Sequence, residues 1–102
     1  MGGILYSVIA TLPDEATRAE YIAWLEDGHL DQVVKGGAHT AMIVRVLDPE
    51  APPQVETRYV FATRDLFDRY VREAAPRLRQ DGLRRFPPER GVGFQRRLGE
   101  IL

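Results

Sequence analysis

The run from Ile4 to Leu12 restricts the fold of this chain more than any other segment. It has the pattern of a β-strand, in which successive side chains point to opposite faces. One alternating set comprises Ile4, Tyr6, Val8, Ala10 and Leu12, and the other comprises Leu5, Ser7, Ile9 and Thr11. Both sets are largely apolar, so the fold needs a covering layer on each side of this strand.

Five further segments complete a regular order of strands and helices. The expected helices cover residues 14–35, with a break near Gly28, and residues 66–86, with a restart at Pro76. The expected strands after the first cover residues 38–47, 55–62 and 92–99. This β-α-β-β-α-β order predicts a ferredoxin-like α+β fold, with a four-stranded antiparallel sheet and both helices on one face.

The predicted arrangement leaves the second face of the sheet without cover. Leu5 and Ile9, or the opposite set, would then form an exposed apolar patch larger than soluble monomers tolerate. A chain of 102 residues holds one ferredoxin-like domain, so it has no second domain to cover the sheet. We therefore expect a homodimer whose two sheets pack together as a dimeric α+β barrel.

Composition disfavours most metal and cofactor chemistry. The chain has no cysteine, and its two histidines, His29 and His39, do not have the spacing of metal ligands on one helix. We therefore expect neither a metal ion nor a cofactor. The net charge is only −1, and basic and acidic residues are interleaved, so we expect no nucleic acid or membrane partner. The N-terminal stretch lacks the basic region of a secretory signal, which favours a cytoplasmic location.

His29 is the side chain best suited to acid–base chemistry. If the first helix continues through Gly28, His29 lies four residues from both Leu25 and Val33, on the inward-facing stripe. It could act there as an acid, a base or a ligand contact. The alternative is a neutral, hydrogen-bonded core histidine or a cap at the helix break.

Breaks in both helices should leave space between the helices and the sheet. Tyr6 and Tyr59 can approach one another on central strands, and a buried phenol needs a hydrogen-bond partner, which Arg96 or Arg45 can supply. Two interpretations are open: these groups satisfy one another in the core, or they form the polar floor of a site for a small carboxylate or phenolic ligand. The candidate ligand-binding residues are His29, Trp24, Tyr59, Arg96 and Arg45.

Two groups of spaced residues resemble a known family. The first group is Trp24-Leu25-Glu26-Asp27-Gly28-His29-Leu30, Gly37-Ala38 and Arg58-Tyr59-Val60-Phe61. The second is Tyr70, Ala75-Pro76-Arg77-Leu78-Arg79, Gly82-Leu83, Arg85-Phe86, Gly91-Val92-Gly93-Phe94-Gln95-Arg96 and Gly99-Glu100. Together they are similar to DUF4286, a small family of bacterial proteins, over about residues 4–101.

This resemblance implies a ferredoxin-like dimeric α/β barrel and no particular reaction. It extends loosely to antibiotic-biosynthesis monooxygenases, stress-responsive barrel proteins and muconolactone isomerases, whose clefts lie between sheet and helices, as an analogy of fold. The expected function is the binding of a small organic ligand. The alternatives are a cofactor-independent isomerase or monooxygenase and an RNA-binding module that stacks bases on Tyr6, Tyr59 and Phe61.

Overall fold

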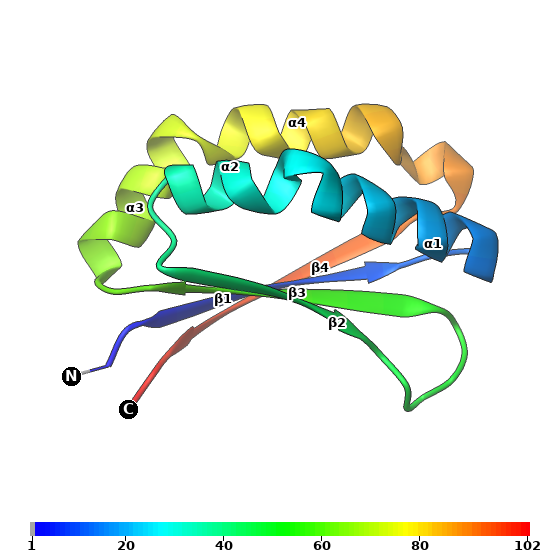
Figure 1. Ribbon diagram of the computed structural model, residues 1–102, viewed down its shortest axis with the longest axis horizontal. Coiled ribbons are helices and arrows are strands. Elements are labelled where there is room, and N and C mark those ends of the chain that lie inside the picture. The colour runs from blue at the N-terminus through cyan, green and yellow to red at the C-terminus, as the bar shows by residue number, and fades with distance from the viewer. Residues whose placement is uncertain (1) are drawn as a thin grey trace.

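The fold is an antiparallel sheet with its helices on one face (Figure 1). It is described by a computed structural model over residues 2–102. The strands are β1 (Ile4–Thr11), β2 (Thr40–Arg45), β3 (Gln54–Phe61) and β4 (Gly93–Glu100). The helices are α1 (Glu15–Trp24), α2 (Leu30–Lys35), α3 (Arg64–Glu73) and α4 (Ala75–Arg85), and a short 3-10 turn at Pro88–Arg90 precedes β4. The predicted ferredoxin-like α+β fold is confirmed.

β1 and β3 are the central strands of the sheet, whose order is β2-β3-β1-β4. The register places Tyr6 of β1 opposite Tyr59 of β3, and Val8 of β1 opposite Arg96 of β4. Directly paired residues point to the same side of a sheet, so these four side chains share the face that the helices cover. The helices leave the other face, which includes Ile9, open (Figure 1).

The first helical segment is interrupted near Gly28, as the sequence predicts. Between α1 and α2, the wider turn Leu25–His29 leaves helical geometry at Asp27 and Gly28, and Gly28 has a φ of 105°. A residue with a side chain is strained at such a positive φ, whereas glycine adopts it freely. Gly28 therefore fixes the break, and the break sets the position of His29 relative to the sheet.

The second helical segment restarts at the predicted proline. α3 ends at Glu73, and α4 begins at Ala75 with Pro76 in its first turn. Proline suits that position because the first residues of a helix need no N–H donor within the helix. The restart places Leu78 of α4 under the helical layer, where it is buried.

Two groups of buried side chains form the core between the sheet and the helices. The first group includes Tyr6, Tyr59, Phe61, Phe67, Tyr70 and Leu78. The second group includes Ala10, Leu12, Tyr21, Leu25, Val55 and Phe86. Tyr6 and Ala10 both belong to β1, so the two groups divide near the middle of this central strand.

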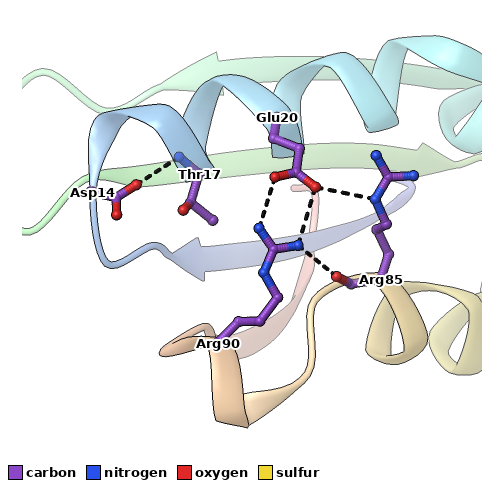
Figure 2. Close-up of polar contacts among 5 residues, drawn as sticks. All are labelled: Asp14, Thr17, Glu20, Arg85 and Arg90. Atoms are coloured by element: carbon purple, nitrogen blue, oxygen red, sulfur yellow. Dashed lines mark hydrogen bonds and ion pairs between the residues drawn. The ribbon is translucent and has the colours of Figure 1, made fainter.

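An ion-pair cluster holds α1 against the segment that follows α4 (Figure 2). The carboxylate of Glu20 accepts hydrogen bonds from Arg90 at 2.7 and 3.1 Å and from Arg85 at 3.2 Å. Hydrogen bonds from Arg90 and Arg85 lower the pKa of Glu20 to about 2, because they favour its charged form. Asp14 caps the start of α1 by accepting the backbone N–H of Thr17 at 2.7 Å (Figure 2). The hydrogen bonds of Glu20 fix α1 relative to the end of α4, whereas the Asp14 cap stabilises the start of α1 itself.

Arg18 attaches α1 to the β2–β3 hairpin from a buried position, where it is 6% exposed. Its guanidinium donates to the carbonyl of Val46 at 3.3 Å, to the carbonyl of Gln54 at 3.2 Å and to the carboxylate of Glu15 at 2.8 Å. A buried charge requires such partners to offset its loss of hydration. Arg18 is therefore a structural arginine.

Candidate functional site

A cavity lies between the helices and the covered face of the sheet, where residues of both core groups meet. Tyr6, Tyr59 and Arg96 line it from the sheet, while α4 and the turn that holds His29 line it from the helical layer. The space open to the centre of a water molecule is about 50 Å³, within about 480 Å³ of empty space that includes the open side. A water molecule needs about 10–15 Å³. The smaller volume, about 50 Å³, therefore has room for several waters or for the polar end of a small molecule.

Aromatic rings form much of the cavity wall. The ring of Tyr6 lies 6.0 Å from that of Tyr59, with 28° between the planes, and 6.2 Å from that of Tyr70. The rings of Tyr21 and Phe94, which also line the cavity, are 6.0 Å apart. These rings come from β1, β3, β4, α1 and α3. The four tyrosine rings are buried, whereas the rings of Phe94 and Trp24 are only half-buried and offer apolar surfaces on which another ring can stack.

The hydroxyl of Tyr6 is the polar centre of the cavity. Arg96 donates to it from Nε at 3.0 Å, and Arg79 donates to it from Nη2 at 3.3 Å. Arg96, and not Arg45, is thus the strand arginine that satisfies a phenol. Among the ion pairs within residues 2–102, none involves Arg79 or Arg96. The cavity therefore has two guanidinium groups whose charge no carboxylate of these residues balances.

The phenols around Tyr6 do not supply the missing negative charge. Burial, opposed by a hydrogen bond with Thr57, raises the pKa of Tyr59 to about 12. Burial also raises the pKa of Tyr70 and of Tyr21 above the usual value for a phenol. At neutral pH these three side chains are therefore uncharged, and each can donate or accept a hydrogen bond.

His29 lies at the border of the cavity, with its ring stacked on that of Trp24 at 4.2 Å and 27°. Burial lowers the pKa of His29 to about 4, partly opposed by the charge of Asp81. The imidazole is therefore neutral at pH 7. An outer groove of about 300 Å³ adjoins the cavity and shares Trp24, His29 and Leu78 with it. The other residues of this groove are Asp27, Gly28, Gln32 and Asp81.

The cavity brings together four of the five residues proposed from the sequence. They are Trp24 at the end of α1, His29 in the following turn, Tyr59 on β3 and Arg96 on β4. Arg45 does not line the cavity, because it is the exposed last residue of the edge strand β2. The expected place of Arg45 is thus corrected. That the other four residues bind a ligand stays a prediction.

Arg79, Tyr70 and Gly82 line the cavity without having been predicted as site residues. Arg79 precedes Leu83 by four residues, so it lies on the border of the apolar stripe of α4. A charged residue on that border is the sequence feature that could have indicated Arg79 as a cavity residue, although many surface helices share this pattern. A Cβ added at Gly82 would lie 3.4 Å from Cη2 of Trp24, so the absence of a side chain there lets α4 approach Trp24 closely.

The RNA-binding alternative is wrong in its choice of surface. Such modules stack bases on aromatic residues of an open sheet face. Here Tyr6, Tyr59 and Phe61 lie on the face that the helices cover, and they are 4%, 2% and 0% exposed. Bases cannot reach these rings without opening the core.

Two kinds of site are not found in the described part of the chain. Within residues 2–102, no three His, Asp or Glu side chains gather where they could hold a metal ion. In the same residues, no helix combines the length and the apolar character needed to cross a membrane. The expected absence of a metal and of a cofactor stays a prediction from composition.

Comparison with known protein families shows to which family the chain belongs. The model of DUF4286, a domain of unknown function, matches residues 3–101. The chain belongs to the DUF4286 family. The resemblance inferred from the spaced residues is thereby confirmed. No curated protein sequence matches this DUF4286 chain.

Solved structures with the same fold are similar to this DUF4286 chain over nearly its whole length. A dimeric ferredoxin-like protein from an uncultured marine organism has a TM-score of 0.73 at 14% identity, covering 100% of this chain and 97% of that one. A dabb family protein from Mesorhizobium loti has a TM-score of 0.67 at 17% identity, covering 100% and 99%. SnoaB, a cofactor-independent oxygenase from Streptomyces nogalater, has a TM-score of 0.66 at 12% identity, covering 97% and 92%. At these identities, the similarity shows the fold alone.

We expect His29 to make the fold less stable as the pH falls from about 6.5 to about 4. A histidine in the unfolded chain takes up its proton near pH 6.5, whereas His29 in the folded protein takes it up only near pH 4. The unfolded state therefore binds more protons in this range, and the free energy of unfolding decreases. Urea unfolding at several pH values should show a smaller acid-induced loss for His29→Gln than for the wild type.

An NMR titration of the imidazole signals checks the cause of this effect. The His39→Gln variant leaves His29 as the only histidine, so its signal can be followed alone. A midpoint at about 4 is expected, whereas a midpoint near the usual value of about 6.5 would contradict the buried, neutral state of His29.

Proposed function

We propose that this protein is a cytoplasmic homodimer that binds a small, flat organic molecule in the cavity between sheet and helices. The observation that carries the proposal is the meeting of Arg79 and Arg96 on the hydroxyl of Tyr6 within an aromatic wall. Neither arginine has a carboxylate partner among residues 2–102. These groups suit a ligand with an acceptor oxygen at one end and an aromatic face.

The side of the cavity between α4 and β4 gives such a ligand access. Arg79, Leu83 and Arg96 line the cavity and are also exposed, and Leu83 is 47% exposed. A ligand entering there meets the two guanidinium groups first and the buried phenols behind them. The enclosed space accepts its polar end, while its ring lies against the wall near the open side.

A cofactor-independent isomerase or monooxygenase is the second candidate function. The neutral imidazole of His29 favours it, because a neutral imidazole on the cavity wall can accept a proton from a bound substrate. A base with a pKa of about 4 is weak, so the substrate would have to be unusually acidic. Conversion of a bound phenol or enol to a new product under air distinguishes this candidate from binding alone.

The open face of the sheet supports the homodimer. Leu5, Ile9, Val44 and Val60 lie on this face half-buried by their neighbours, and Met42 is 53% exposed. Arg58 and Glu56 form an ion pair at 3.0 Å beside them. A second copy laid sheet to sheet would cover these apolar side chains and bring charges of both signs to the contact. A ferredoxin-like protein of similar structure is described as dimeric.

Binding of a flat ligand should be visible through Trp24, the only tryptophan of the chain. Because Trp24 lines the cavity, we expect phenol and benzoate to change its fluorescence in a saturable way. The Arg96→Met variant should bind them about tenfold more weakly or worse, because a hydrogen bond to a charged donor is lost. Titration of fluorescence against ligand concentration measures both affinities.

Arg77→Met is the matched control, because Arg77 is exposed on α4 and does not line the cavity. It should bind phenol and benzoate as the wild type does. Equal weakening in Arg77→Met and Arg96→Met, or no saturable change in any form, would contradict ligand binding in the cavity.

The homodimer should have about twice the chain mass of 11.6 kDa in light scattering at micromolar concentration. Ile9→Lys should shift it to the monomer, because contact between the two sheets would remove the hydration of the new ammonium group and of Glu56 opposite it. The monomer should stay folded, since the new side chain lies opposite Glu56 on the same face.

Val34→Lys serves as the control for the dimer, because Val34 is 42% exposed on α2 and remote from the open face. It should keep the mass of the dimer. A wild-type mass near that of one chain would overturn the homodimer and leave the open face to another partner.

A further inference from the structure

The Tyr6 hydroxyl can act toward a ligand only as a donor. A phenol oxygen has two lone pairs and one proton. Arg96 Nε at 3.0 Å and Arg79 Nη2 at 3.3 Å both donate to this oxygen, and a guanidinium cannot accept a hydrogen bond in return. Both acceptor sites of the oxygen are therefore used, and its proton is left for a third group.

The packing of Tyr6 holds this donor in a fixed place. Its ring lies 5.3 Å from that of Phe67 and 6.0 Å from that of Tyr59, and the residue is 4% exposed. The ring cannot swing away without disturbing the core. A donor held in this way needs no reorganisation when an acceptor arrives, which strengthens its interaction with a developing or full negative charge.

We propose that the cavity binds its ligand as an oxyanion: an acidic phenol or enol releases its proton to solvent on binding, and its charged oxygen accepts a hydrogen bond from the Tyr6 hydroxyl beside Arg79 and Arg96. This inference rests on the proposed function and names the chemistry of the ligand. The protein gains no proton and loses none in this step, so one proton appears in solution for each ligand molecule that was protonated before it bound.

The charges around Tyr6 favour the anion. The titratable and charged groups that face it or line the same cavity are Tyr59 on β3, Arg96 on β4, Tyr21 on α1, Tyr70 on α3, Arg79 on α4 and His29 in the turn after α1. Tyr21, Tyr59 and Tyr70 are neutral at pH 7, and so is His29. The two guanidinium groups, which lie 3.0 and 3.3 Å from the Tyr6 oxygen, thus determine the local charge. A positive charge within about 4–6 Å of an acidic oxygen favours its ionised form.

Para-nitrophenol tests the inference, because its phenolate absorbs at longer wavelength than its phenol. At a pH below its own pKa, the probe should show the phenolate band when bound, and the phenolate should bind at least about tenfold more tightly than the phenol. Calorimetry in two buffers of different ionisation heat should show the release of one proton for each phenol bound.

Variants assign the effect to the named groups. Tyr6→Phe keeps the ring and removes the donor, so we expect the preference for the phenolate to fall several-fold. Arg96→Met removes one charge from an exposed residue, so it keeps the test valid if Tyr6→Phe does not fold. Arg77→Met is again the control and should keep the wild-type preference.

The outcomes separate this inference from the proposed function. Binding of the probe with equal affinity for phenol and phenolate overturns the oxyanion inference and leaves ligand binding standing. An unchanged preference in both Tyr6→Phe and Arg96→Met overturns it as well. Absence of any saturable response from Trp24 or from the probe overturns both proposals.

Discussion

The hydrogen bonds that Arg96 and Arg79 donate to Tyr6 join the three parts of the molecule on which the cavity depends. Tyr6 lies on the first strand, in the middle of the sheet, whereas the arginines come from the last strand and the last helix. The pairs are separated by 90 and 73 residues in the chain. The polar centre therefore exists only once β4 has joined the sheet and α4 has packed over it. The two guanidinium groups there, which form no ion pair within residues 2–102, are the basis of the proposed preference for a negatively charged ligand.

The glycine break in the first helical segment shapes the opposite wall. Because Gly28 adopts a φ of 105°, α2 restarts in a new direction, and His29 turns onto the ring of Trp24. Gly82 lets α4 approach the same tryptophan from above. These positions explain two glycines that would otherwise weaken helices. The wall is thus built from backbone breaks and stacked rings, while the ion pairs of Glu20 fix the far end of the helical layer.

Much of the fold follows from local sequence patterns. The apolar alternation of β1 and the helix interruptions at Gly28 and Pro76 each depend on only a few neighbouring residues. The same patterns placed Trp24, His29, Tyr59 and Arg96 near one crevice. Arg79 could not be predicted as a partner of Tyr6, since their contact depends on how α4 crosses the sheet. Arg45 shows a second limit. Alternation along its strand predicts the face of the sheet on which Arg45 lies, but its exposure depends on the strand order, which places β2 at the edge of the sheet.

The central claim is that Tyr6, with its two arginines, holds a charged ligand oxygen in the cavity. A crystal structure of the protein with bound para-nitrophenol tests it most directly. The phenolate oxygen should lie about 2.5–2.7 Å from the Tyr6 hydroxyl oxygen, as expected for a hydrogen bond to an anion. The ring should lie against the aromatic wall. A probe bound only on the open sheet face or in the outer groove near Asp27, or with its oxygen turned away from Tyr6, would contradict the claim.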